Sequence, residues 1–278
     1  MRARSVTGAY MEMTKPAADD AIHDYWNVHT LGFQYLRDRK IEVGSREFFD
    51  YLRPWMNPYK FPWIMERIER EAAILRDGHL LEVGCGMGYD SLEFLKRGVR
   101  VTVTDLTPNA VEITRRHFEL ERVEAEDVRV ENVLDLSFAD HTFNAVWADG
   151  VLHHTGDAEG AVQEARRVLK PGGRAIISHF YRKPSWMYWI SRLSRENIEF
   201  TEEDPPVTDF CTESEILAMF RGFRIESVTR EHYRALPVAR QGLKATLYTR
   251  IFKPVYNTLP ARLVERLAYK LSVTAIKV

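Results

Sequence analysis

The sequence predicts an α/β protein in which a mostly parallel sheet is covered by helices on both faces. A short apolar run, Leu80–Val83, leads straight into a glycine-rich loop and then into a helical pattern. A β-branched run, Val99–Thr104, follows that helix, and strand-like and helix-like runs continue to alternate after it. Alternation of this kind is typical of parallel strands joined by crossover helices.

The segment before the first strand is expected to be helical from Asp24 to about Asp77. It is rich in aromatic residues, and Asn57, Pro58 and Pro62 interrupt its pattern. Residues 1–20 are polar and show no periodicity, which predicts a tail.

The central segment, residues 78–180, carries most of the strand signals. Strands are expected at residues 80–83, 99–104, 128–130, 143–148 and 174–180. Pro108 begins one helix, and a second covers Ala158–Leu169 and ends at the turn Lys170-Pro171-Gly172-Gly173.

After Tyr181 the alternation is interrupted. Residues 183–200 mix Trp and Tyr with basic residues, a helix is expected at 212–220, and a strand at 223–229. Residues 235–270 are expected to be a helical excursion before a last strand at 272–278. The chain therefore divides into an N-terminal tail and helical lid (1–77), a ligand-binding core (78–180), and a part that completes the sheet and caps the substrate (181–278).

Composition excludes several classes of protein. The chain has 278 residues, a formal charge of -1, 45% apolar and 28% charged residues, which is typical of globular domains and gives no reason to expect a nucleic-acid partner. Cys85 and Cys211 form neither a disulfide framework nor a zinc-ligand spacing. No apolar run is long enough for stable membrane insertion, and we expect a cytoplasmic location.

The glycine loop and the next strand end predict a nucleoside ligand. Asp105 ends the second strand, 21 residues after Gly84, where an acidic residue bonds a ribose diol in doubly wound folds. Gly88 comes one residue too early for the GxGxxG spacing of dinucleotide loops. Glu82 would repel a pyrophosphate but would suit the ammonium and sulfonium of S-adenosylmethionine (SAM). Charge and spacing both favour SAM over NAD.

Five segments resemble the motifs of class I SAM-dependent methyltransferases, in order and at the expected distances. They are Leu81–Gly88, Val103–Pro108, Asn132–Phe138, Gly150–Thr155 and Leu169–Gly173. Within this superfamily the chain looks most similar to bacterial quinone and small-molecule methyltransferases. The resemblance implies a Rossmann-like, doubly wound, seven-stranded, mostly parallel sheet with an antiparallel last strand, plus a helical cap.

The resemblance also implies which residues contact SAM. Glu82, Gly84 and Gly86 would hold the methionine moiety, and Asp105 would bond the ribose. The remaining contacts would come from Tyr25, Leu106, Asn132, Val133 and Ala148. Asn132 stands where an acidic residue is usual. Its amide can still accept a bond through the oxygen, and unlike a carboxylate it can also donate one through the nitrogen. Tyr25, with Trp26 and His29, would close over SAM, where an aromatic face favours a sulfonium.

The implied reaction is O- or C-methylation of a small molecule, such as a secondary metabolite or a quinone-like or isoprenoid compound, with S-adenosylhomocysteine as the product and no metal. A hydroxyl acceptor needs a general base. His153 and His154 follow the fourth strand, at the edge where such folds bind ligands. Tyr181 follows the fifth strand at the same edge and is a candidate for contacting the acceptor, as is Arg182, which would suit an anionic one.

Other readings stay open at this point. An NAD-dependent oxidoreductase or epimerase would need a GxGxxG loop and a Tyr-x-x-x-Lys or similar dyad, and neither occurs. A non-catalytic partner subunit would be expected to have a degraded glycine loop, whereas this one is intact. Aromatic and basic residues at 183–195 are also compatible with action at a membrane surface. The identity of the acceptor and a homo-oligomeric state are not determined by the sequence.

Overall fold

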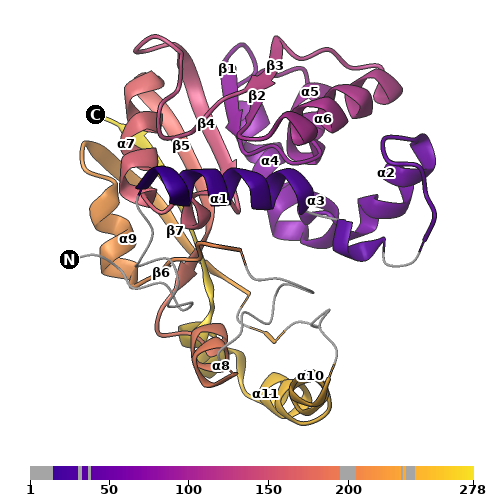
Figure 1. Ribbon diagram of the computed structural model, residues 1–278. Helices are drawn as coiled ribbons and strands as arrows, with labels where there is room; N and C mark the ends of the chain where they lie inside the picture. The colour runs from indigo at the N-terminus through magenta and orange to yellow at the C-terminus, as the bar shows by residue number, and fades with distance from the viewer. Residues whose placement is uncertain (1–14, 31–32, 37–38, 195–204, 233, 236–241) are drawn as a thin grey trace. The chain divides into compact units, whose positions relative to one another are not determined.

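Strands and helices alternate as the hydrophobic pattern predicts (Figure 1). The structure is a computed structural model that describes residues 15–30, 33–36, 39–194, 205–232, 234–235 and 242–278. Most of the predicted N-terminal tail therefore lies outside the described residues. In the part of the chain that is described, no helix has both the length and the apolar character that crossing a bilayer requires.

Seven strands form the sheet in the order β3-β2-β1-β4-β5-β8-β7, with a short eighth strand, β6, paired to β5. The strands are β1 (His79–Val83), β2 (Arg100–Asp105), β3 (Asp127–Val130), β4 (Phe143–Asp149), β5 (Leu169–Arg182), β6 (Phe210–Cys211), β7 (Phe223–Glu231) and β8 (Lys270–Lys277). The sheet is mostly parallel, with antiparallel C-terminal strands. The predicted seven-stranded architecture is confirmed, and β6 is the addition.

The parallel register of β1 with β2 positions the predicted ligand site. Val83 pairs with Thr104, the last residue before Asp105. The glycine loop and Asp105 therefore leave the sheet side by side, at the carboxyl edge where parallel α/β sheets bind ligands.

By contacts, the chain forms two compact units, each assembled from separate stretches. The sheet-start unit contains residues 23–149, 164–176 and 276–278, and the sheet-end unit contains residues 1–22, 150–163 and 177–275. The division into lid, core and cap predicted from the sequence concerns function, and it stays a prediction.

The sheet-start unit contains the N-terminal helices α2 (Arg46–Leu52), α3 (Asn57–Lys60) and α4 (Pro62–Ile74), and the crossover helices α5 (Tyr89–Lys96) and α6 (Pro108–Glu121). Ser45 caps α2 and Thr107 caps α6 through their side-chain oxygens. The predicted aromatic segment packs inward: Phe48, Phe49 and Leu52 of α2 are buried against Tyr89 and Ile113.

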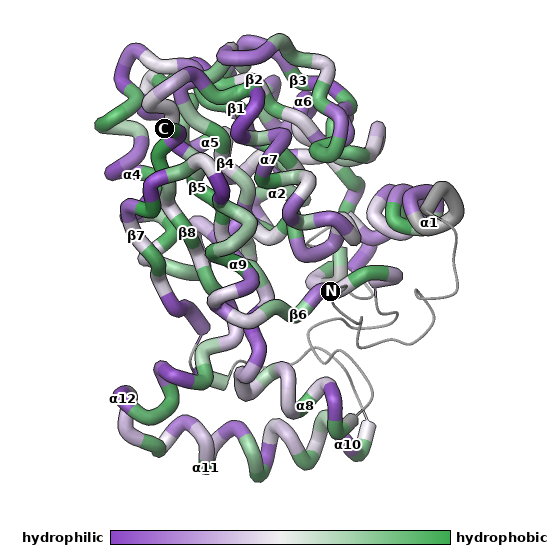
Figure 2. Tube along the Cα trace, turned by 90° about the vertical axis from the view of Figure 1, so that its left-hand side faces the viewer, coloured by the Kyte–Doolittle hydropathy of each residue, from purple (hydrophilic) through white to green (hydrophobic). Residues whose placement is uncertain are grey.

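The sheet-end unit contains α8 (Trp186–Ser194), α9 (Glu213–Met219) and the helical excursion predicted at 235–270. Its described residues form α10 (Leu243–Leu247), the π-helix η5 (Tyr248–Phe252), α11 (Lys253–Thr258), α12 (Ala261–Val264) and the 3-10 helix η6 (Glu265–Leu267). Figure 2 shows hydrophobic and hydrophilic residues alternating along it. Tyr248 and Tyr256 are buried in the same cluster as Trp186 and Tyr269.

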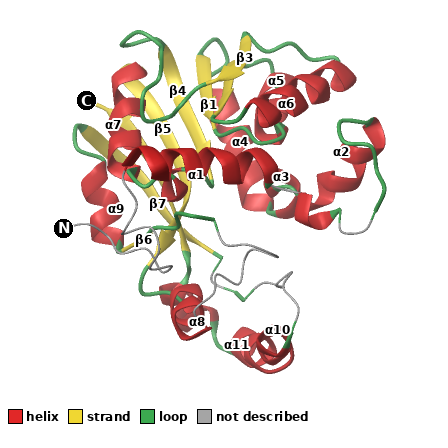
Figure 3. Cartoon of the chain, viewed as in Figure 1, coloured by secondary structure: helices red, strands yellow, loops and turns green. Residues whose placement is uncertain are grey.

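Two boundaries differ from those predicted; Figure 3 shows where the helices and strands lie. Helix α1 (Lys15–Val28) begins before Asp24, within the stretch expected to be patternless. Helix α7 (Ala158–Val168) ends where β5 begins, so the turn expected at 170–173 belongs to the strand. Within this strand Gly172 still has φ of +75°, a turn-like conformation that glycine adopts at no steric cost.

Candidate active site

The glycine loop between β1 and α5 has two parts with different roles. Gly84 and Gly86 have φ of +70° and +57°, and a Cβ built on Gly86 would meet no atom within 4 Å. Open space therefore lies beside this backbone, which a ligand could approach closely. Gly88 has no such space, because a Cβ there would lie 2.7 Å from the Thr114 Cγ2 atom. Gly88 is thus required for packing of α5 against α6.

Asp105 ties the loop to the start of α6. Its Oδ2 atom accepts the Gly86 N–H at 3.0 Å, and its Oδ1 atom accepts both the N–H and the hydroxyl of Thr107 at 3.0 Å. These bonds use three of the roughly four acceptor positions of a carboxylate. Burial raises the pKa of Asp105, and hydrogen bonds from Gly86, Thr107 and the Leu106 backbone oppose that shift. The carboxylate that was predicted to bond a ribose therefore also holds the loop in shape.

Three carboxylates, Glu82, Asp90 and Asp149, gather beside the loop. Glu82 lies in the buried part of β1 and accepts the Ser91 hydroxyl. Asp90 accepts the Trp147 indole N–H at 2.8 Å, and Asp149 accepts the Asn57 amide at 2.8 Å. These hydrogen bonds keep the three acids in place.

The acidic cluster is electrostatically unfavourable when its members are ionised. Burial and the charge of Asp90 raise the pKa of Glu82 well above its usual range. Burial and the charge of Asp149 raise the pKa of Asp90 to about 8. Close like charges in a buried place attract a cation strongly. Sequence reasoning found only Glu82; Asp90 in the first turn after the loop and Asp149 at the end of β4 became candidates only through packing.

Asn132 and Val133 lie in the loop that follows β3. Asn132 is exposed, and its Oδ1 atom accepts the Leu134 N–H at 2.9 Å. Since the turn uses the amide oxygen, the amide nitrogen is the group better placed to contact a ligand, as a donor. Val133 and Leu106 are half-buried, while Ala148 is fully buried within β4.

The C-terminal end of α1 is fastened to the start of α6, close to Leu106. The Asn109 amide donates to the Asn27 carbonyl at 3.1 Å and to the Thr30 hydroxyl at 3.2 Å. On this helix end, the Tyr25 ring stacks on His29 with centroids 4.4 Å apart. This tie brings Tyr25 to the side of the sheet-start unit that carries Asp105.

The predicted catalytic residues belong to the sheet-end unit and contact one another. The His153 ring stacks on Tyr181 with centroids 4.1 Å apart, and it lies 4.0 Å from the His154 ring. All three side chains are buried. Burial and the neighbouring charge of His154 lower the pKa of His153 well below its ordinary value, so this ring is neutral at physiological pH.

His154 is held by a main-chain hydrogen bond. Its Nδ1 atom lies 2.7 Å from the Val207 carbonyl oxygen, which can only accept, so Nδ1 carries the proton and Nε2 the lone pair. A ring oriented in this way is suited to act as a base. Arg182 is not placed to bind an anion, because its guanidinium donates to the carbonyls of Ala268 and Arg266.

Comparison with known proteins identifies what this arrangement is similar to. Residues 81–177 match a family model described as a methyltransferase domain. The ubiquinone biosynthesis O-methyltransferase of Xanthomonas oryzae pv. oryzae (strain PXO99A) is 34% identical over 132 residues, which is 47% of this chain and 52% of that relative. The protein of the same description from Xanthomonas axonopodis pv. citri (strain 306) is 30% identical over 179 residues, 63% of this chain and 72% of the relative.

The chain thus spans about half the length of the first of these relatives. Solved structures agree in fold. A putative methyltransferase from Bacillus halodurans C-125 has a TM-score of 0.54 at 17% identity, covering 77% of this chain and 98% of its own. The [4+2]-cyclase SpnF has a TM-score of 0.58 at 16% identity, covering 92% and 94%. At such identities the likeness shows the fold alone.

Proposed function

The chain belongs to the class I SAM-dependent methyltransferases, and we propose that it moves a methyl group from SAM to a small-molecule acceptor. SAM supplies an activated methyl group on a sulfonium. The observation that carries the proposal is the acidic cluster of Glu82, Asp90 and Asp149 beside the glycine loop. A ligand with an ammonium and a sulfonium relieves the repulsion between these acids, whereas the pyrophosphate of NAD increases it.

Each group of the sheet-start unit has a role in this proposal. The open space beside Gly86 lets the methionine moiety approach the loop at Gly84 and Gly86, and Asp105 bonds the ribose. The Asn132 amide donates to a ring nitrogen of the adenine, because its oxygen is used by Leu134. Leu106 and Val133 flank the adenine ring, the backbone at Ala148 faces the ammonium, and Tyr25 closes over the site.

The chain's part in the reaction is alignment and proton removal. Holding the acceptor in line with the methyl group supplies much of the rate acceleration. For a hydroxyl acceptor, the Nε2 lone pair of His154 takes the proton, with His153 and Tyr181 packed beside it. The relatives named for ubiquinone biosynthesis support a quinone-like acceptor, and a cytoplasmic location stays a prediction.

The fold alone does not establish methyl transfer, since one solved structure that shares it is a [4+2]-cyclase. Titration calorimetry provides the test. The protein is expected to bind SAM and not NAD. The bound cation lowers the carboxyl pKa values, so binding should release protons, and affinity should rise between about pH 6.5 and 8, the range below the pKa of Asp90.

The Asp90→Asn variant tests the acidic cluster directly. Its amide oxygen still accepts the Trp147 N–H, while one titrating charge is removed. It should bind SAM more weakly and release fewer protons, as measured by the dependence of binding enthalpy on buffer ionisation. Binding of NAD in preference to SAM would overturn the proposal. Proton release unchanged in Asp90→Asn would remove the acidic cluster as its basis.

A further inference from the structure

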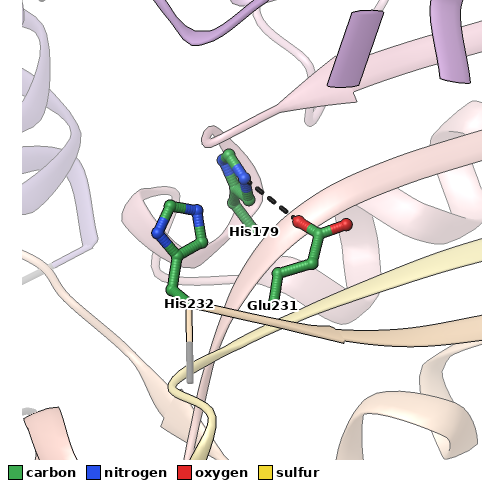
Figure 4. A group of neighbouring side chains, drawn as sticks. All are labelled: His179, Glu231 and His232. Atoms are coloured by element: carbon green, nitrogen blue, oxygen red, sulfur yellow. Dashed lines mark ion pairs between the residues drawn. The ribbon is translucent and has the colours of Figure 1, made fainter. Parts of the chain in front are cut away.

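Three metal-ligand side chains meet in the sheet-end unit, outside the groups used above. His179 lies in β5, Glu231 ends β7, and His232 follows it (Figure 4). All three are buried, and one ligand atom from each lies within 4.8 Å of the other two. The His179 Nε2 and Glu231 Oε2 atoms are 3.2 Å apart. We define these residues as the His-Glu-His cluster.

The backbone of the cluster is in an unfavourable conformation at both histidines. His179 has φ of +66° and His232 has φ of +55°, a region that is unfavourable for residues with a Cβ. The Trp186 indole N–H holds the His232 carbonyl at 2.8 Å. Strain of this kind persists where the surrounding structure enforces it, and it concentrates at functional sites. An ion pair between His179 and Glu231 alone would not explain why a ring nitrogen of His232 also lies within 4.8 Å of their ligand atoms.

The donor set matches a divalent transition metal. Two imidazoles and one carboxylate are the ligands of a common class of zinc site, which leaves a fourth position open. Ligand atoms about 2.0–2.2 Å from a tetrahedral ion lie roughly 3.3–3.6 Å from one another. Small side-chain rotations would bring the three ligand atoms, now within 4.8 Å of one another, to that separation. Gly150, which follows β4, is adjacent: a Cβ there would lie 4.0 Å from the His179 Nδ1 atom. We propose that the His-Glu-His cluster binds one Zn²⁺ ion or a similar divalent transition metal.

The test uses the full chain, stripped with a chelator and reloaded with Zn²⁺ or Co²⁺. We expect one equivalent of zinc by elemental analysis after desalting, and a Co²⁺ form with tetrahedral visible absorption bands. His179→Gln, Glu231→Gln and His232→Gln should each lose at least about 100-fold in zinc affinity. His141→Gln, which removes an imidazole bonded to Leu169 in the other unit, is the matched control and should bind as the parent does.

Two results would overturn this proposal. One is the absence of stoichiometric zinc or cobalt from the parent protein. This measurement uses no variant, so a misfolded variant cannot cause it. The other is retention of zinc by all three cluster variants. SAM binding is measured separately, so a failure here leaves the proposed methyl transfer untouched.

A second, independent feature lies on the helical excursion of the same unit. From Leu243 every fourth residue is a large apolar one, and all of them are exposed, by 76% at Leu243 and by 39% at Leu259. We call this set the apolar stripe: Leu243, Leu247, Ile251, Val255, Leu259 and Leu263. A four-residue repeat drifts by about 40° per step in an α-helix, and the wider π-turn of η5 opposes that drift.

The stripe is not the face by which these helices attach to the unit. That face is formed by Tyr248, Phe252 and Tyr256, whose rings lie 6.0–6.4 Å from the Trp186 ring. With the inner face anchored, the apolar stripe points away from the core. On α8, Trp189 and Leu193 are also exposed, by 49% and 83%.

Charge indicates what covers the stripe. Residues 243–264 contain Lys244, Arg250, Lys253 and Arg262 and no acidic residue. A second copy of this chain would bring like charges together across a two-fold interface, whereas an anionic bilayer surface complements them. Exposed apolar residues beside basic ones are typical of helices that lie in the membrane interface. We infer that the apolar stripe docks on anionic phospholipid, which also suits a lipophilic acceptor.

Co-sedimentation with vesicles tests this. The full chain should sediment with vesicles of phosphatidylglycerol and phosphatidylcholine, and not with phosphatidylcholine alone, and high salt should weaken binding. The double variant L247D/I251D should bind at least about tenfold more weakly. I74D, which adds one such negative charge at an exposed position (53%) of α4, should bind like the parent. Equal sedimentation with both vesicles, or a parent dimer that L247D/I251D dissociates, would overturn the inference.

Discussion

Replacing His154 by Gln is expected to lower turnover of a hydroxyl acceptor by about 10²–10⁴-fold, with SAM affinity nearly unchanged. The His154 Nδ1 proton is donated to the Val207 carbonyl, so Nε2 is the basic atom, and Gln has no group of comparable basicity. Steady-state kinetics and calorimetry on the same preparation separate a loss of rate from a loss of cofactor. His153→Gln is the matched control: it removes the adjacent buried imidazole, and the rate should fall only a few-fold.

The pH profile distinguishes the two histidines. A base must be deprotonated to act, so the rate rises with pH up to its pKa and is level above it. A rise in rate with pH that disappears in His154→Gln would identify His154 as that base. The pKa of His153 is lowered well below its ordinary value, so His153 as the base would give a level profile at neutral pH. Small, equal losses in both variants with native-like melting would exclude histidine base catalysis and make Tyr181 the next residue to test.

Replacing Asp105 by Ala is expected to weaken SAM binding by at least tenfold and up to about 100-fold, because a charge-assisted hydrogen bond to ribose is lost. Ala also abolishes the bonds from Asp105 to Gly86 and Thr107. A lower melting temperature should therefore accompany the weaker binding, and both are measured without an acceptor.

Thr107→Val separates these two effects. It removes one hydroxyl bond to Asp105 and the cap on Ala110, at a cost of about 1 kcal/mol in stability, while the carboxylate remains. SAM affinity should then stay within a few-fold of the parent. If Thr107→Val weakens SAM as much as Asp105→Ala does, Asp105 acts only through the shape of the loop, and the ribose is bound elsewhere.

Much of the fold could be predicted because the signals are local. The β-branched run before Asp105, Pro108 at the start of α6, and the paired glycines after Val83 each define their element through neighbouring residues. The two-residue strand β6 could not be predicted, because Phe210 and Cys211 carry no strand periodicity and form a strand only by pairing with Tyr181 and Arg182 of β5.

The candidate site shows the same division. Motif spacing identified Glu82, Gly84, Gly86 and Asp105. It did not identify Asp90 and Asp149, whose importance lies in their mutual distance rather than in their position along the chain. Arg182 was expected at the rim, yet two main-chain carbonyls that follow it by more than eighty residues hold its guanidinium.

By itself the sequence determined the family, the alternation of strands and helices, and the loop where a nucleoside ligand is expected, because these depend on glycine conformation, side-chain size and short spacing. Only the tertiary structure decided which groups share a buried space. It raised the pKa values of Glu82 and Asp90, fixed the tautomer of His154, and brought His179 to Glu231 and His232. Electrostatic energy and desolvation depend on distance in space, and distances between residues remote in the chain arise only when the sheet and its helices are assembled.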